Sequence, residues 1–530
     1  MTETQKTKQH GRLYYLFENL GKKGKVWWKN NRFTFIVSLV VIASLTFIFR
    51  EEFQPGVIFL RQYFFLGTIG VALSYPLYRM IKVKNWKLRI FAAALIALVA
   101  GSLWLTSYEG VEPYQYLALY NRYNSLPIVT LEKQPLTGHE RIMPDDAVLA
   151  VARGSASGEE PMPPDFVRIG NEFRYTLAIE PAVITGRFGS CIKEIINVSG
   201  TEASVDFSHR DKVNFCVGEN LLLGKKTATA VTRSFGIERF LSYEPSDIRY
   251  MPNDAGEWVE VVSLIHWKGM FFPYPEFGGV QVINQDPTDQ TIWQHMTSMA
   301  ERTLFGKGTW IRPKDIDKYP FLQGQSIKAK EVSTYIANSI KFHNGLPGFT
   351  KLLGPMPGFH KNDVRIPNVK QPATTYCSDA VPGGLYHYFG MAPWQTDKHG
   401  LNPSVFIPAD GSDTVYLYDH IVYGEHLKGL EDIFALVRDT KKAYLWPNIA
   451  AEHRPYIRDI NGQRRFLVLT TIGTFKDIKA DVKTANSSFE TSVPEVAITD
   501  PAIRKTIWVD VYHPENWTKA IAEEIAPLWK

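Results

Sequence analysis

Three histidine–carboxylate pairs between residues 419 and 453 are the groups best suited to chemistry. They are Asp419-His420, Glu425-His426 and Glu452-His453. Imidazoles and carboxylates serve as zinc ligands and as general acids and bases. The candidate catalytic residues are therefore His420, His426, His453 and Glu425, and the candidate metal ligands are Asp419, His420 and His426. His420 and His426 are six residues apart, which is not the H-E-x-x-H spacing, so the alternative is local hydrogen bonding at the ends of elements.

Two further segments come near catalytic motifs and depart from them. Residues 218–227 (GENLLLGKKT) have one residue too many between the glycines of a phosphate-binding loop, and a second lysine replaces its hydroxyl residue. Ser190 and Lys193 fit the S-x-x-K pattern, but the partner motifs follow in the wrong order. The first segment is more typical of a strand followed by a basic turn, and a bare S-x-x-K is expected by chance in 530 residues. The sequence indicates no cofactor.

Three cysteines are too few for a disulfide scaffold or a four-cysteine zinc site. Cys191 and Cys216 are the pair that an oxidising compartment would allow to form one disulfide. The alternative is that all three thiols are free and buried, which is common for cysteine.

The elements that would position these groups are mainly hairpins. Strand-like segments alternate apolar and polar residues around four turns, at Gly170-Asn171, 253–256, Asp410-Gly411 and Asn461-Gly462. Helical spacing of apolar residues is clearest over 289–305, 330–342, 426–438 and 517–529. The fold class predicted for the mass of the chain is therefore α+β, a large β-rich region with a few helices, forming two domains.

Three hydrophobic segments near the N-terminus predict transmembrane helices over 33–49, 57–78 and 90–105. A helix rises 1.5 Å per residue and must cross about 30 Å of hydrocarbon, so each segment is near the required length. Arg61 lies near one end of the second, where its long side chain can reach the interface. Ala93, Ala97 and Gly101 recur at four-residue spacing in the third and predict close helix packing.

Lysine and arginine near the helix ends predict the orientation. The tail and the link at 79–89 are basic, whereas the loop at 50–56 is not, so the N-terminus should be cytoplasmic and residues 108–530 extracytoplasmic. The net charge of +5 is concentrated before residue 90, which disfavours nucleic-acid binding by the folded region. Low cysteine use in so large an external region favours a bacterial plasma membrane over a eukaryotic secretory membrane.

The resulting domain prediction runs in six parts along the chain. They are a basic tail (1–32), the three-helix anchor (33–107), a stalk and linker (108–165) with a loop over 152–165, a β-rich domain (166–287), a helical connector (288–345) and a second β-rich α+β domain (346–530).

The function expected from this organisation is that of a non-catalytic binding or structural component of a membrane complex in the cell envelope. Its partners would be the lipid bilayer and other envelope proteins or further copies of the chain. One alternative is an anchored hydrolase that acts on envelope polymers through the 419–453 cluster. Another is a subunit of a transport or channel assembly, which would need oligomerisation because three helices are few for a pore.

Overall fold

The computed structural model describes residues 50–82, a few positions between 86 and 96, and then 113–156, 159–202, 210–269, 272–288, 292–343, 364–380, 383–393, 400–441, 449–476, 490–491 and 494–529. The chain divides into two units, residues 1–57 and 58–530. In the first unit, the described residues 50–57 form the beginning of helix α2 (Arg50–Lys82). All features below belong to the second unit.

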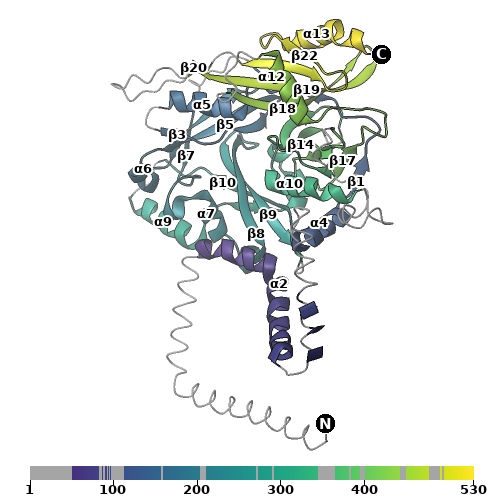
Figure 1. The fold of residues 1–530 in the computed structure, drawn as a ribbon. Coiled ribbons are helices and arrows are strands. Elements are labelled where there is room, and N and C mark those ends of the chain that lie inside the picture. The colour runs from purple at the N-terminus through teal and green to yellow at the C-terminus, as the bar shows by residue number, and fades with distance from the viewer. Residues whose placement is uncertain are drawn as a thin grey trace, which may run out of the picture. The chain divides into compact units, whose positions relative to one another are not determined.

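The second unit is a mixed α+β structure rich in antiparallel sheet, as the sequence predicted (Figure 1). All four predicted hairpins are present. They join β4 to β5, β8 to β9, β16 to β17 and β18 to β19. At the last of these turns Asn461 and Gly462 both have positive φ, the conformation that favours an Asn-Gly pair in a two-residue hairpin.

A six-stranded sheet combines the segment after α4 with strands far along the chain. Its order is β1-β17-β16-β14-β13-β2, and β1 runs parallel to β17 whereas the other pairs are antiparallel. The strands are β1 (Ile128–Thr130), β2 (Thr137–Gly138), β13 (Ala373–Cys377), β14 (Gly384–Gly390), β16 (Ser404–Pro408) and β17 (Val415–Tyr418).

The other sheets form from strands closer in sequence. One contains β3 (Glu159–Pro161), β4 (Asp165–Ile169), β5 (Glu172–Pro181), β6 (Ile192–Ser199) and β7 (Arg210–Phe215). A second contains β8 (Tyr243–Pro252), β9 (Trp258–Lys268), β10 (Tyr274–Asn284) and β11 (Thr309–Ile311). A third contains β18 (Ile449–Ile460), β19 (Gln463–Lys476), β20 (Glu490–Thr491), β21 (Glu495–Asp500) and β22 (Lys505–Val509). A short ribbon pairs β12 (Val364–Arg365) with β15 (Ala392–Pro393).

Helices follow the predicted periodic segments closely. The predicted ones are α9 (Ile292–Phe305), α10 (Lys330–Ser339) continued by the 3-10 turn η4 (Ile340–Phe342), α12 (Leu430–Thr440), and α13 (Trp517–Glu524) followed by η7 (Ala526–Leu528). The remaining helices are α4 (Pro113–Ser125), α5 (Asp145–Ser155), α6 (Ile184–Gly189), α7 (Thr227–Arg233) and α8 (Ile237–Ser242), with 3-10 turns η1 (Leu223–Lys225), η2 (Pro313–Lys318), η3 (Pro320–Leu322) and η6 (Pro514–Asn516). Because α5 continues to Ser155 and β3 follows, the loop expected over 152–165 is shorter than predicted.

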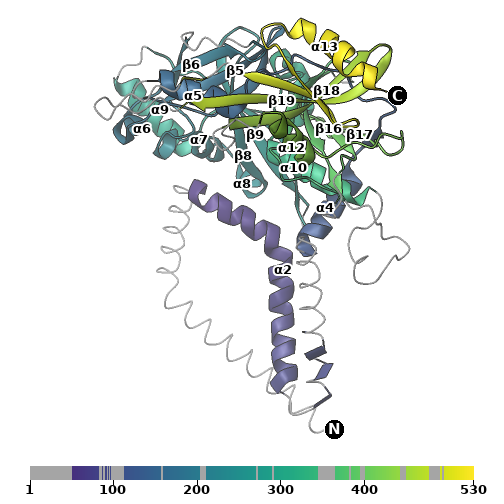
Figure 2. The ribbon, with the colours of Figure 1, turned by 45° about the horizontal axis from the view of Figure 1, so that its top comes forward.

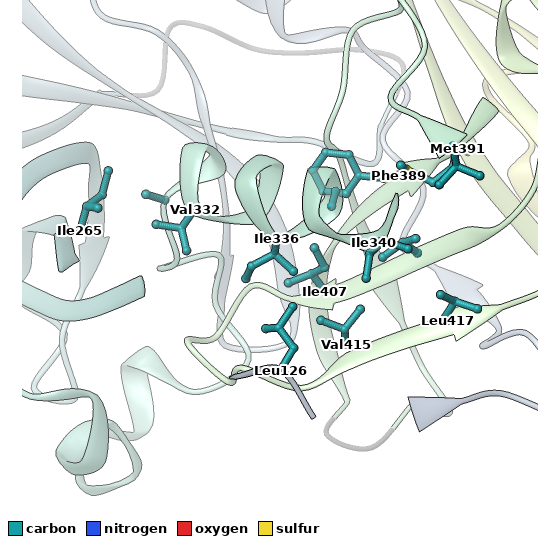
Figure 3. Close-up of a cluster of buried hydrophobic side chains, with 14 of the residues drawn as sticks. Leu126, Ile265, Val332, Ile336, Ile340, Phe389, Met391, Ile407, Val415 and Leu417 are labelled. Carbon is teal, nitrogen blue, oxygen red and sulfur yellow. The ribbon is translucent and has the colours of Figure 1, made fainter. Parts of the chain in front are cut away.

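One face of the six-stranded sheet packs on α10. Val332, Ile336 and Ile340 of the helix segment meet Phe389 and Ile407 of the sheet in one buried apolar cluster (Figure 3). Ile58 of α2 belongs to the same cluster and is 4% exposed. The four-residue spacing of the helix side chains places them on one side, which explains why this periodic segment folds as a helix against a sheet.

The opposite face of this sheet packs on the third sheet and on α12. Tyr388 and Phe406 meet Phe466 and Val468, and Ile433 of α12 joins them. The third sheet is covered on its other face by α13, as Figure 2 shows. Trp517 and Ile521 of α13 belong to a buried apolar cluster with Leu467 and Ile498 of this sheet. The sheets and helices therefore form successive layers in which polar groups between layers need internal partners.

The three predicted membrane spans fall differently on the described residues. Residues 33–49 lie outside them, 57–78 lie within α2, and 90–105 are represented only by positions between 90 and 96. Of the packing stripe, Ala93 is helical and exposed, while Ala97 and Gly101 lie outside the described residues. In the part of the chain that is described, no helix combines the length and apolar composition needed to cross a membrane.

Candidate functional site

His420 is the centre of a buried hydrogen-bond network at the end of β17. Its Nδ1 lies 2.7 Å from Oε2 of Glu425, and its Nε2 lies 2.8 Å from the hydroxyl oxygen of Ser404. The Ser404 oxygen is also 3.2 Å from the hydroxyl of Tyr388. Because a carboxylate can only accept, Nδ1 of a neutral His420 carries the proton and Nε2 accepts from Ser404.

The Glu425 carboxylate is held from several sides. Tyr418 donates to Oε1 at 3.2 Å, and Gln134 donates to Oε2 at 3.4 Å. The main-chain N–H of Glu425 donates to the carbonyl oxygen of His420, which closes the turn between them. Burial, followed by the charge of Glu425, raises the pKa of Tyr418, so its hydroxyl stays a donor.

This arrangement has the order of groups found in a serine hydrolase: a carboxylate, an imidazole and a hydroxyl in hydrogen-bond contact. It lacks access. The side chains of His420 and Ser404 have no exposed surface, and the rings of Phe466 and Tyr418 lie against His420 at 5.3 Å and 5.0 Å.

The main chain around Ser404 is also committed to the sheet. Ser404 pairs with Gly390 of β14 on one side and with Tyr418 of β17 on the other, so it lies in the interior of the sheet. Acyl transfer requires hydrogen-bond donors directed at the developing oxyanion. The hydrogen bonds among Tyr388, Ser404, His420 and Glu425 tie β14, β16 and the turn after β17 together.

The other candidate residues do not join this network. Oδ1 of Asp419 accepts the main-chain N–H groups of Ile421 and Val422, which caps the turn. His426 is exposed. His453 lies in β18, where its Nδ1 is 2.8 Å from the hydroxyl of Thr470.

His453 is a buried neutral base. Burial, with a smaller contribution from Arg454, lowers its pKa to about 4. Within the described residues, no group of three or more histidine, cysteine, aspartate or glutamate side chains could hold a metal ion.

The two cysteine candidates are joined. Cys191 and Cys216 form a disulfide with a Cα–Cα distance of 4.2 Å, which links the start of β6 to the end of β7. Cys377 is a free, buried thiol in β13. The disulfide closes a loop of 25 residues and therefore restricts the unfolded chain.

The glycine-rich segment 218–227 binds a carboxylate of its own chain. The main-chain N–H groups of Glu219 and Asn220 donate to Glu180 at 2.6 Å and 2.9 Å. Lys225 donates to the carbonyl oxygens of Gly189 and Ser190. The groups that would cradle a phosphate in a nucleotide-binding loop are occupied here.

A second polar site, not predicted from the sequence, surrounds a cavity of about 100 Å³. It is lined by residues from four separate segments: Arg141 before α5 with Asp145 at the first position of that helix, Lys330 at the start of α10, Lys370–Thr374 leading into β13, and Glu452 with His453 in β18. Spacing could not have revealed it, because these segments meet only in the folded chain. The same is true of Ser404, which is 16 residues from His420.

Comparisons of this chain with protein-family models, with curated proteins and with solved structures found no match.

Proposed function

We propose that this chain is a membrane-anchored envelope protein whose domain, residues 108–530, lies outside the cytoplasm and acts as a non-catalytic binding or structural component of a membrane complex. The observation that carries this proposal is the Cys191–Cys216 disulfide. Disulfides persist in oxidising compartments and are rare in the cytosol. The bacterial plasma membrane remains the favoured location, with the N-terminus in the cytoplasm.

The exposed side chains of the N-terminal segments support an anchor. Phe59, Leu60, Trp86, Ile90 and Phe91 are each more than half exposed. Large apolar groups concentrated in this way are costly in water and suit a lipid environment. The three-span arrangement predicted from the sequence would place them in the bilayer.

The contacts of Arg61 agree with this topology. Its guanidinium donates to the carbonyl oxygens of Leu241 and Gly269, which belong to the folded domain. The start of the second predicted span would then lie on the same side of the membrane as the domain. The basic link at 79–89, at the far end of α2, would lie on the cytoplasmic side, as the positive-inside rule requires.

A partner-binding role is supported by apolar side chains exposed on short helices of the domain. On α9 Trp293 and Phe305 are 78% and 68% exposed, and on α8 Ile237 is 83% exposed. Aromatic residues are enriched in protein interfaces because they bury large apolar area with few rotatable bonds. We take α9 as the surface to test.

The test is co-purification from solubilised membranes with three forms of the full chain. Wild type should be recovered in a complex larger than the monomer. The double variant Trp293→Ser, Phe305→Ser should lose that complex. Tyr512→Ser, which removes an aromatic side chain that is 56% exposed elsewhere on the domain, should keep it. Recovery of wild type only as a monodisperse monomer would contradict the proposal.

An anchored hydrolase is the second candidate, favoured by the hydrogen-bonded series Ser404, His420 and Glu425. If the turn after β17 opens, Ser404 becomes a nucleophile with its general base in place. A fluorophosphonate probe should then label the wild-type chain and fail to label Ser404→Ala. Absence of labelling in the wild type would exclude this alternative without affecting the test of partner binding.

A further inference from the structure

The cavity beside α5 and α10 is lined by two carboxylates that already accept hydrogen bonds from within the protein. Oε1 of Glu452 accepts the main-chain N–H of Asp145 and the Lys370 ammonium, each at 3.1 Å, and its Oε2 accepts from Arg141 at 3.2 Å. Asp145 accepts from Arg141 at 2.5 Å and from the hydroxyl of Tyr175 at 3.0 Å. The acids of the site are therefore neutralised within the protein.

Some donors remain unpaired after these pairs are formed. Nε of Arg141, which is 6% exposed, has no acceptor, and neither have Nε and Nη1 of Arg454, which is 2% exposed and lies outside the cavity lining. The Lys330 ammonium contacts no acceptor among the described residues. Among the described lining residues, Oε1 of Gln371 and Oδ2 of Asp145 also have no hydrogen-bond partner. Buried polar groups are normally satisfied, so the unpaired donors favour a bound water or anion in this cavity.

Three basic side chains line the cavity, those of Arg141, Lys330 and Lys370, beside the carboxylates of Asp145 and Glu452. Three acids outside the lining partly offset this charge: Asp146 pairs with Lys370, and Asp165 and Asp247 lie close enough to interact with Lys330. Two helices of ten or more residues, α5 and α10, begin at this cavity. The positive ends of their dipoles add to the potential that an anion experiences.

The cavity limits the ligand to a small one. Its volume of about 100 Å³ is well below the roughly 300–1,000 Å³ of pockets that hold drug-sized ligands. A single tetrahedral or planar oxyanion fits this space, and a nucleotide does not.

We propose that this cavity binds a compact oxyanion, a phosphate group or a small carboxylate, held by the Arg141 guanidinium, the Lys330 ammonium and the Thr374 hydroxyl. Arg141 and Lys370 are fixed by their own ion pairs, so they are preorganised for a further acceptor. Lys330 is exposed at the rim and supplies a charge that is free to turn toward the ligand. This proposal does not depend on the location of the domain.

The experiment is isothermal titration of the purified full chain with inorganic phosphate, glycerol phosphate and acetate, at constant ionic strength maintained with chloride. Binding of inorganic phosphate with one site per chain is expected. Equal or tighter binding of glycerol phosphate would assign the site to phosphate esters, and preference for acetate would assign it to carboxylates.

Two lysine variants test the site itself. Lys330→Gln should weaken binding about ten- to hundredfold, since a hydrogen bond to a charged group contributes about 1.5–3 kcal/mol. Lys318→Gln removes a lysine that is 72% exposed and lies outside the cavity lining, and it should leave the affinity unchanged. Lys330→Arg should restore part of the binding.

The proposal fails if none of the three anions binds at millimolar concentration. It fails equally if Lys330→Gln and Lys318→Gln bind phosphate alike. Lys330 is exposed and its side chain has no described hydrogen-bond partner, so its replacement does not threaten the fold. Thr374→Val, which removes one cavity hydroxyl at nearly constant volume, provides a second, independent reduction in affinity.

Discussion

Glu260 is a carboxylic acid buried within β9, and its replacement by glutamine should change how stability depends on pH. The side chain has no exposed surface. Oε1 accepts the hydroxyl of Thr227 at 2.5 Å, whereas Oε2 has no described donor. Burial raises the pKa of Glu260 to about 7, and the hydrogen bond from Thr227 and the charge of Lys307 only partly oppose that effect.

The magnitude follows from proton linkage. The pKa is about 7 in the folded chain and 4.5 for a free glutamate, so between these values the folded state holds a proton that the unfolded state has lost. The stabilisation from this group is therefore complete below pH 4.5 and is lost as pH rises through 7. A difference of about 2.5 pH units corresponds to about 3 kcal/mol.

Glu260→Gln keeps the shape and removes the proton equilibrium. Relative to wild type, its free energy of unfolding should rise by about 3 kcal/mol between pH 4.5 and pH 8. The assay is chemical denaturation of both proteins at several pH values, followed by tryptophan fluorescence. Glu257→Gln, at an exposed position on the same hairpin, is the control for loss of a surface charge. A difference between Glu260→Gln and wild type that stays constant over this range would show that folding does not raise the pKa of Glu260.

Three further perturbations have defined outcomes. Replacing Cys191 and Cys216 by alanine should lower the free energy of unfolding by about 3 kcal/mol, because the disulfide closes a loop of 25 residues in the unfolded chain. In a thermal melt, reductant should then have no effect on the variant. Ser404→Ala should cost about 1–3 kcal/mol by calorimetry, because Nε2 of His420 loses its donor. The buried neutral His453 has a pKa of about 4, so it contributes stability above pH 6.5 that is lost as pH falls toward 4. In His453→Gln, the free energy of unfolding should therefore fall by about 3 kcal/mol less than in wild type between pH 6.5 and pH 4.

Much of the local structure could be predicted from the sequence because its determinants are local. Turn residues such as Asn461-Gly462 fix a hairpin through backbone conformation at two positions. Apolar spacing over 330–342 fixes a helix face. The pairing of β1 with β17, which are almost 290 residues apart, has no such local signal and depends on which apolar faces fit together.

The candidate site was predictable only in part. His420 and Glu425 are five residues apart, so a turn can join them, and both were identified as candidates. Ser404 was missed because a lone serine in an apolar strand carries no motif. The oxyanion cavity was missed for a stronger reason, since its lining comes from four segments between residues 141 and 453.

The proposed topology places residues 108–530 across a membrane from the N-terminus. The most direct test is labelling of intact bacterial spheroplasts with a membrane-impermeant maleimide, in a Cys377→Ala background. Tyr512→Cys, on the exposed surface of the domain, should react in intact spheroplasts, and Lys87→Cys, in the basic link, should react only after lysis. Protection of Tyr512→Cys until lysis would contradict the account.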